Sequence, residues 1–372
     1  MPPSRTLLIV GSPGRDAVRA VVAHAREASF TADVAETAEE ARVWLEQQRA
    51  DAVLVGPDAT LAEAMCMQLR MQAEWSDVPV LRLVRQFDDL MFPDTFAWGG
   101  DDVVRLDALH QLVPRLRGLP AHVRRVAGGA TGKVVVAGIE PRRRVVTGRV
   151  LRNAGWDVRF AADMDEALAG ATDPTVSLVV CEDDTPTDGV IAVADAAIAA
   201  GSKATFVVMV DPKHLAEARA DAARHPQVTV VDAYAPPENV LFVANELLRT
   251  QAGEARASAR LLYGTTVAFR VAGRGEDMVG FSYNLSAGGL YVRTLACLSR
   301  GDEAWVELTP PRSDRRVRLV AKVAWHRPFG PNDVATVPPG FGVQFVDGAG
   351  GDLDRYRTGY DTLYADVLGR AA

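Results

Sequence analysis

The chain has 372 residues, of which 48% are hydrophobic, so it is long enough for two or three domains with sizeable cores, and wholesale disorder is excluded. Its three cysteines, Cys66, Cys181 and Cys297, lack the spacing of a disulfide framework or a zinc site. The net charge of −7 is uneven, because residues 1–250 hold 26 Lys+Arg against 35 Asp+Glu while residues 251–372 hold 15 against 13. The acidic front part does not resemble a nucleic-acid-binding surface.

Membrane and metal functions find no support in the sequence. The N-terminal segment has a five-residue apolar run and then turns polar, and no later apolar run approaches bilayer-spanning length. The six histidines form no cluster, so no metal site is expected. We therefore expect a cytoplasmic protein without membrane insertion, which binds neither nucleic acid nor metal.

An internal repeat occupies the first 250 residues. One copy begins with Leu7-Leu-Ile-Val-Gly11 and the other with Val134-Val-Val-Ala-Gly138. Such short apolar runs are typical of strands buried on both faces. Helix-like and strand-like stretches then alternate, which predicts a parallel α/β sheet in each copy. The clearest of these are a helix at 15–28 and strands at 52–55 and 80–84 in the first copy, and a helix at 142–154 and strands at 178–181 and 205–210 in the second.

Residues 117–132 are rich in glycine and form a linker signature between the copies. We place the first domain at residues 1–118 and the second at 131–250. A third domain, of different character, follows at residues 254–370.

Two short signatures accompany the repeat. Gly99-Gly-Asp-Asp102 precedes the last strand of the first copy, and Pro186-Thr-Asp-Gly189 follows the third strand of the second. Together with the strand order, they resemble response-regulator receiver domains, which implies a flavodoxin-like parallel sheet. In that family an acidic pair after strand one holds Mg²⁺, an aspartate after strand three accepts phosphate, and a lysine follows strand five.

The residues that carry receiver chemistry are missing here. Gly11-Ser12 and Gly138-Ile139 stand in place of the acidic pair. The acceptor position falls on Gly56 in the first copy and on Cys181 or Glu182 in the second, depending on register. We therefore expect no phosphorylation.

Other residues do not restore that chemistry. The position of the lysine falls near Arg105-Leu106 and near Ala235, and the nearby Asp58 and Asp183 are interpreted as solvated loop acids. We interpret both copies as degenerate receivers, which present surfaces to protein partners or to a second copy of the chain as a homodimer.

After Gly253 the apolar residues follow strict alternation. Val267, Phe269 and Val271 alternate, as do Val279, Phe281 and Tyr283, and a longer run alternates from Val317 to Trp325. Strands that are apolar on one face only, joined by Gly and Pro turns, indicate an antiparallel barrel or sandwich. Trp325 lies on the apolar face of its strand, so we expect it to pack in the core.

The chain ends in a different pattern. Leu353, Tyr356, Tyr360, Leu363 and Val367 follow helical spacing. This predicts a final amphipathic helix that closes or flanks the barrel.

Four motifs in this last part belong together. They are Arg256-x-x-x-Arg260, Asn284-x-Ser286-x-x-Gly289, Val323-x-Trp325 and Gly340-Phe-Gly-Val-Gln-Phe345. Over about the last 115 residues they resemble a PilZ domain. The resemblance implies a six-stranded all-β barrel and, as in many members of that family, binding of the bacterial second messenger cyclic di-GMP. It also implies that Arg256 and Arg260 form the arginine motif, and that Asn284, Ser286 and Gly289 form the polar turn.

The chemistry of these residue types suits that ligand. An arginine fork matches the O6 and N7 acceptors of guanine and pairs with phosphate oxygens. An asparagine both donates and accepts, which suits a second guanine edge. Gly289 has no Cβ to keep a ligand away from the turn. Each motif alone is common, since two arginines four apart occur on many helices and Gly288-Gly289 suits any hairpin turn.

The sequence thus predicts a non-catalytic bacterial signalling protein that binds cyclic di-GMP and needs no cofactor. We expect the small-residue segment from Arg249 to Arg260 to be ordered by the ligand, which would reorient the barrel relative to the front domains. The alternative is a ligand-independent scaffold in which all three domains are degenerate docking modules. An enzyme is the weakest hypothesis, because no phosphate loop, nucleophile elbow or acidic and histidine cluster is found.

Overall fold

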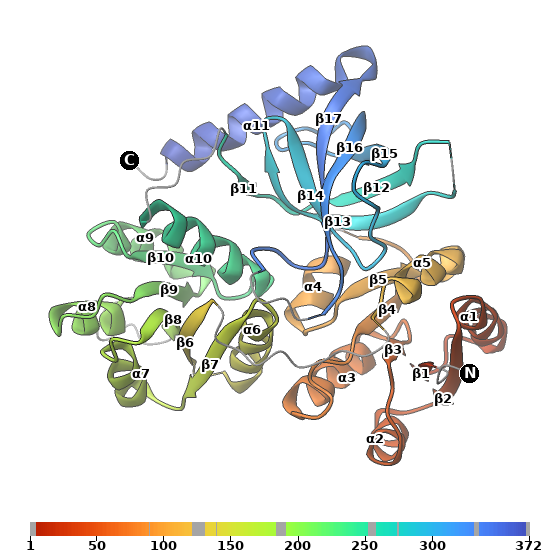
Figure 1. Ribbon diagram of the computed structural model, residues 1–372, viewed down its shortest axis with the longest axis horizontal. Coiled ribbons are helices and arrows are strands. Elements are labelled where there is room, and N and C mark those ends of the chain that lie inside the picture. Colours follow the sequence, from red (N-terminus) through yellow and green to blue (C-terminus); the bar gives the residue numbers. More distant parts are fainter. Residues whose placement is uncertain are drawn as a thin grey trace.

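Three sheets organise the chain, in a computed structural model (Figure 1). The structure describes residues 5–88, 90–120, 131–138, 140–183, 191–251, 258–273, 275–330 and 335–369. The first two sheets are parallel and belong to α/β domains, and the third is an antiparallel barrel. The fold class expected from the sequence is therefore confirmed. Arg256 lies outside the described residues, as do the linker residues 121–130.

The first α/β domain has the strand order β2-β1-β3-β4-β5. Its strands are β1 (Arg5–Val10), β2 (Phe30–Ala35), β3 (Ala52–Val55), β4 (Val80–Val84) and β5 (Asp102–Arg105). Its helices are α1 (Arg15–Glu27), α2 (Ala38–Gln47), α3 (Ala59–Met71), α4 (Met91–Ala97) and α5 (Leu112–Arg117). This is the 2-1-3-4-5 order of the flavodoxin-like doubly wound fold.

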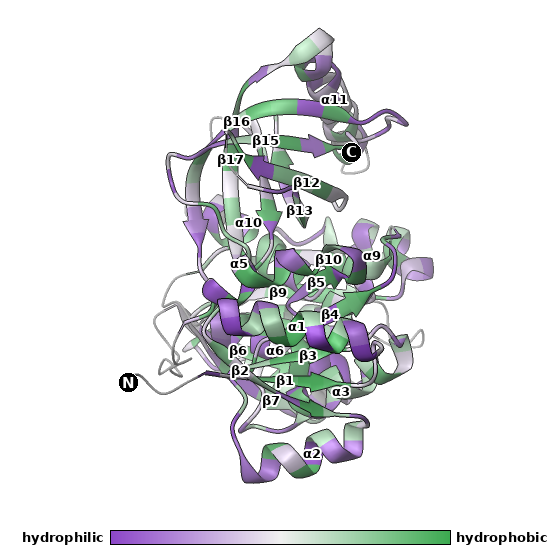
Figure 2. Ribbon diagram, turned by 90° about the vertical axis from the view of Figure 1, so that its right-hand side faces the viewer, coloured by the Kyte–Doolittle hydropathy of each residue, from purple (hydrophilic) through white to green (hydrophobic). Residues whose placement is uncertain are grey.

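The second α/β domain repeats this topology, with the order β10-β9-β8-β6-β7. Its strands are β6 (Gly132–Ala137), β7 (Trp156–Ala161), β8 (Val176–Asp183), β9 (Thr205–Val210) and β10 (Val228–Asp232). Its helices are α6 (Pro141–Asn153), α7 (Met164–Ala171), α8 (Ala192–Ala199), α9 (Leu215–Ala222) and α10 (Glu238–Gln251). In both domains the central strands are buried on both faces, as continuous apolar runs require, and Figure 2 shows them as green ribbons between more polar helices.

The two copies also begin their second helix in the same way. Thr37 accepts a hydrogen bond from the Glu40 amide, and the Glu40 carboxylate accepts one from the Glu36 amide. In the second copy Asp163 and Glu166 make the corresponding pair of bonds. The second helix of each copy is therefore capped by the same pair of side-chain hydrogen bonds, a variant of the capping box.

The third sheet is closed by the pairing of β13 with β14, so that within the described residues its six long strands form a barrel. The strands are β11 (Leu261–Leu262), β12 (Thr266–Val271), β13 (Met278–Ser286), β14 (Gly289–Arg293), β15 (Glu303–Leu308), β16 (Val317–Arg327) and β17 (Gly340–Gly348). The predicted final helix is α11 (Asp352–Gly369), which runs along the top of the barrel in Figure 1. Tyr356 and Tyr360 on α11 contribute to the barrel core.

One strand departs from the expected one-sided pattern. Val279 and Phe281 of β13 do not face the barrel interior but pack outward against Phe92 and Phe96 of the first α/β domain. Tyr283 likewise packs against Phe242 of α10. The outer face of β13 is therefore buried because the barrel docks on both front domains.

Asp102 is the centre of the contact between the first domain and the barrel. Its carboxylate is fully buried and accepts hydrogen bonds from the Arg115 guanidinium, the Thr294 hydroxyl and the Leu295 amide, all within 2.9 Å. Arg115 is also fully buried, and it donates a second bond, of 2.5 Å, to the carbonyl of Val279. The ion pair between Arg115 and Asp102 thus binds β13 and the two residues that follow β14.

The neighbouring Asp101 joins the first domain to the second. Its carboxylate contacts Arg70 of its own domain at 3.0 Å and Arg149 of α6 at 3.0 Å. Although burial disfavours the charge, these two guanidinium groups and the Val80 amide hold the pKa of Asp101 below its usual value. Asp101 therefore stays ionised and paired at neutral pH.

The barrel and the second domain are joined by two arginines. Arg293 pairs with Glu238 at the start of α10 at 2.6 Å, and its guanidinium lies 3.3 Å from the ring centroid of Phe96. Arg327 donates to the carbonyl of Asn153 at the end of α6, at 2.9 Å. We call the set of Asp101, Asp102, Glu238, Arg293 and Arg327, with their partners, the junction. Its carboxylates and Arg293 are buried in ion pairs, and the buried Arg327 donates to backbone carbonyls instead, so each buried charge has hydrogen-bond partners.

Candidate functional site

The predicted polar turn lies at the end of β13 and the start of β14. Residue pairs Leu285–Leu290 and Ser286–Gly289 close the hairpin, with Gly288 in the turn. A Cβ on Gly289 would lie 2.1 Å from the carbonyl oxygen of Val343, whereas one on Gly288 would meet nothing within 4 Å. Gly289 is therefore required by the close approach of β14 to β17, which is a packing reason in addition to the expected one.

The register of β11 brings the arginine segment to this turn. Leu261 pairs with Leu285 and Leu262 with Asn284 in antiparallel fashion. Continuing that register by one residue places Arg260 beside Ser286. The 23 residues between Arg260 and Asn284 thus fold back so that the two motifs meet.

A cavity of about 310 Å³ opens where they meet. It is lined by Ser258, Arg260, Asn284, Ser286, Gly288, Gly289, Leu290, Tyr291, Ala324, Trp325, Gly342, Val343 and Gln344. Four of the five predicted site residues are therefore in one cavity, and the fifth, Arg256, lies outside the described residues. Among the described lining residues Arg260 is the only charged one.

Asn284 is the most informative member of the cavity. Its side chain is only 4% exposed, yet it lines the cavity, and within the described part of the chain its amide group makes no side-chain hydrogen bond. The amide group faces the cavity and is therefore available to its contents. An occupant with hydrogen-bonding edges would both donate to it and accept from it.

Trp325 is placed differently from the sequence expectation. Its ring is half-buried, packs against Tyr291 with ring centroids 4.9 Å apart, and borders the cavity. A β-bulge between Val323 and Trp325 shifts the register with β17, so that Trp325 lies opposite Gly342. A Cβ on Gly342 would lie 2.6 Å from the indole nitrogen, so this glycine makes room for the ring. Trp325 is therefore part of the cavity wall as well as of the packing.

The positions that would carry receiver chemistry lie elsewhere, at the carboxyl ends of the two parallel sheets. Val10 pairs with Val55 in the first sheet and Ala137 with Cys181 in the second, so the counterpart of Gly56 is Glu182. This register settles the alternative left open by the sequence. Glu182 is buried and pairs with Arg143, which in turn stacks over Tyr234.

Asp58, one of the two nearby acids, has a structural role. Asp58 accepts a hydrogen bond from the Leu61 amide at 2.7 Å and so caps the start of α3. No group of three or more His, Cys, Asp or Glu side chains within the described residues is arranged to hold a metal ion. None of the helices in the described ranges combines the length and apolarity needed to cross a bilayer.

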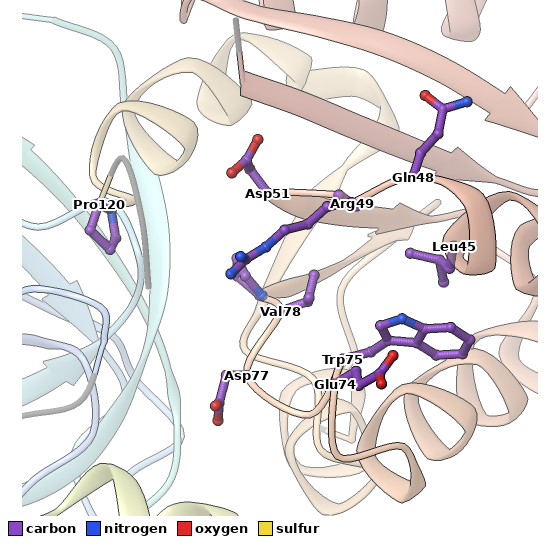
Figure 3. A pocket seen from close by; sticks show the side chains of 11 residues that line it. Leu45, Gln48, Arg49, Asp51, Glu74, Trp75, Asp77, Val78 and Pro120 are labelled. Carbon is purple, nitrogen blue, oxygen red and sulfur yellow. The ribbon is translucent and has the colours of Figure 1, made fainter. Parts of the chain in front are cut away.

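A larger hollow, of about 490 Å³, lies in the first domain (Figure 3). Its lining includes Asp51 and Val78, which stand just before β3 and β4, so it opens at the amino ends of the strands. Ligands of open α/β sheets bind at the opposite, carboxyl ends. Arg49, Glu74 and Asp77 give it mixed charge, and we assign no site to it.

The comparison with protein families decides the nature of the barrel. Residues 254–358 match the family model described as PilZ domain. The C-terminal third of this chain is a PilZ domain. The match includes both motifs that line the cavity, as well as Arg256.

Comparison with solved structures gives matches that each cover part of the chain. The Bacillus subtilis inhibitor of motility MotI/DgrA is 19% identical over 30% of this chain and 53% of its own length, with a TM-score of 0.24, so the match spans about half of that protein. A putative response regulator from Chloroflexus aurantiacus is 22% identical over 32% of this chain and 98% of its own, with a TM-score of 0.29. The PilZ domain of CeSA from a cellulose-synthesizing bacterium is 16% identical over 30% and 99%, with a TM-score of 0.21. The comparison with curated proteins gave no match.

Proposed function

We propose that this protein is a non-catalytic signalling protein that binds cyclic di-GMP in the cavity of its PilZ domain. The observation that carries the proposal is that one cavity is lined both by Arg260 and by the amide of Asn284, which makes no side-chain hydrogen bond among the described residues. Guanine presents adjacent acceptors to an arginine fork and both donors and acceptors to an amide. The phosphodiesters add two negative charges, which favour a positive wall.

Each cavity residue would make a different kind of contact with the ligand, and its placement indicates which. Arg260 supplies charge and a planar fork, Asn284 supplies a donor and an acceptor, and Gly288 leaves the rim open. Ser286 contributes a hydroxyl at the hairpin end. Arg256, four residues before Arg260, would supply the second fork. No cofactor is required for binding.

The front domains are proposed to pass the binding event to protein partners, in the cytoplasm. The closed Glu182–Arg143 pair and the absence of an acceptor aspartate at Gly56 favour docking over phosphotransfer. The expected reorientation of the barrel would have to break the buried junction. We therefore revise that hypothesis: the barrel keeps its place, and the surface offered to partners changes around the cavity.

Calorimetric titration of the full chain with cyclic di-GMP tests the proposal. The wild type should bind with 1:1 or 2:1 ligand stoichiometry, and Arg260→Ala should reduce the affinity at least 10-fold, because a charge-assisted bidentate contact is lost. Arg270→Ala, on the exposed face of β12, is the matched control and should bind as the wild type does. A folded wild type that gives no binding heat at high ligand concentration would refute the proposal.

The second candidate function is a ligand-independent scaffold. Two observations favour it: the buried ion pairs between domains, such as Arg293–Glu238, and the ion pair with Arg143 that Glu182 makes at the acceptor position of the second copy. The discriminating experiment is complementation in cells with an Arg256→Ala/Arg260→Ala variant. Full restoration of function by that variant would favour the scaffold, and loss of function with normal protein levels would favour the receptor.

A further inference from the structure

Helix α11 carries two tyrosines whose hydroxyl groups contact the two motifs that line the cavity. Tyr356 and Tyr360 are four residues apart, so they lie on the same face of the helix, and that face packs on the barrel. Neither ring borders the cavity itself. Their hydroxyl groups reach past the core to the backbone of the two motifs.

Tyr356 contacts the polar turn. Its side chain is fully buried, with the ring against Phe345 at a centroid distance of 4.6 Å. Its hydroxyl lies 2.9 Å from the carbonyl oxygen of Ser286 and 2.8 Å from that of Gly289, the two residues that close the hairpin. Burial raises the pKa of Tyr356, so the hydroxyl remains a donor at every physiological pH.

Tyr360 contacts the arginine segment. Its hydroxyl donates to the carbonyl of Ala259 at 3.0 Å, and Ala259 immediately precedes Arg260. The strand that follows, β11, has only two residues, so sheet pairing alone gives this segment little support. The tyrosine therefore fixes the chain at the point where it enters the cavity.

We propose that α11 is a functional part of the ligand site and that Tyr356 and Tyr360 are its positioning residues. One hydroxyl holds the turn that carries Asn284 and Ser286, the other holds the segment that carries Arg260, and the rigid helix sets the separation between them. The inference rests on the proposed function, because it assigns to these tyrosines the pre-organisation of the cyclic di-GMP site. Pre-organisation raises affinity by removing part of the ordering cost from the binding step.

The first arm of the test uses the free protein and needs no ligand. Hydrogen exchange is compared in the full chain between the wild type, Tyr356→Phe, Tyr360→Phe and Tyr364→Phe. Tyr356→Phe should accelerate exchange in peptides covering residues 286–290, and Tyr360→Phe in those covering 258–262, each about 3- to 10-fold. Tyr364→Phe is the matched control, since Tyr364 stacks on Tyr360 one turn further along and its hydroxyl makes no hydrogen bond among the described residues.

The second arm is calorimetric titration of the same proteins with cyclic di-GMP. Tyr356→Phe and Tyr360→Phe should each weaken binding about 3- to 10-fold without lowering the thermal midpoint of the barrel by more than the control does. The ligand should also slow exchange in α11, because coupling between two sites is reciprocal. If the Tyr356→Phe variant fails to fold, Tyr360→Phe decides the matter alone.

The outcomes separate this inference from the proposed function. Wild-type binding with unchanged affinity in both tyrosine variants would overturn the positioning role and leave the receptor standing. Unchanged exchange at both motifs would overturn it whether or not the ligand binds. Absence of wild-type binding would refute the receptor, and segment-specific exchange would then still support the structural coupling of α11 to the two motifs.

Discussion

The two ends of the hairpin formed by β13 and β14 differ in one physical respect. At the end that carries Phe281 and Arg293, outward-facing side chains are buried against both front domains, and every charge has a partner. At the other end, Asn284 is equally buried but has no partner for its side chain among the described residues, and the surface is hollowed. The first end is satisfied by the protein itself, whereas the second leaves the amide of Asn284 facing a cavity.

The difference separates polar groups whose partners lie within the protein from a polar group that faces a cavity. Buried charges such as those of Asp102 and Arg115 cost free energy unless they are paired, and in the junction their pairing links domains. The amide of Asn284, by contrast, faces the cavity that Arg260 also lines. The contrast predicts that substitutions at one end affect stability, and those at the other affect binding.

The largest effect is expected from Asp102→Ala at the junction. The substitution leaves the fully buried Arg115 without its carboxylate and removes the bonds to Thr294 and Leu295, so the free energy of unfolding should fall by about 3–5 kcal/mol. Denaturant unfolding should also separate into distinct transitions for the first domain and the barrel. The matched control is Asp107→Ala, which breaks the exposed pair with Arg105 and should cost under about 1 kcal/mol. Equal stability of the two variants would contradict the account of the junction.

The two glycines of the turn should respond very differently to the same substitution. Gly289→Ala drives a methyl group against the Val343 carbonyl, and the barrel should lose about 1–3 kcal/mol of stability or more as β14 and β17 separate. Gly288→Ala faces open space and should leave the thermal midpoint nearly unchanged. Differential scanning calorimetry of both variants makes the comparison, and a destabilised Gly288→Ala beside a normal Gly289→Ala would reverse the assignment.

Asn284→Ala should weaken the binding of cyclic di-GMP by about 1–1.5 kcal/mol, while the thermal midpoint stays constant or rises. The substitution removes a contact to the ligand and also a buried polar group without a partner. Titration and thermal unfolding of the same preparation supply both numbers. A marked loss of stability with unchanged affinity would place Asn284 on the structural side of the comparison.

The smallest effect is expected in the radius of gyration when the ligand binds. Because the junction buries paired charges from all three domains, the barrel should not rotate away, and the radius of gyration should change by less than a few per cent. Small-angle scattering with and without cyclic di-GMP measures this. A large change on ligand addition would restore the reorientation that the sequence suggested.

Much of the fold follows from local patterns in the sequence. Strands β3, β4 and β9 begin and end where their apolar runs do, and the helical spacing from Leu353 onward gives α11. The motifs at Arg260 and Asn284 meet because a short hairpin joins them. These features depend on neighbours in the chain, so a single sequence is sufficient to predict them.

Other features depend on contacts between distant residues. Phe281 and Tyr283 alternate like core residues, but alternation shows only that a face is buried, not that another domain covers it. One hydrogen-bond partner of Asp102 in the barrel, Thr294, lies 192 residues further along the chain, and no spacing rule connects the two. Trp325 turns toward the cavity through a β-bulge that its strand pattern does not reveal.

The most direct test of the central claim is a crystal structure of the full chain grown with cyclic di-GMP. The account predicts difference density in the cavity, with guanine edges within hydrogen-bonding distance of Arg260 and Asn284, and an unchanged junction around Asp102. An empty cavity at saturating ligand, or the dinucleotide bound at a different place on the molecule, would contradict it.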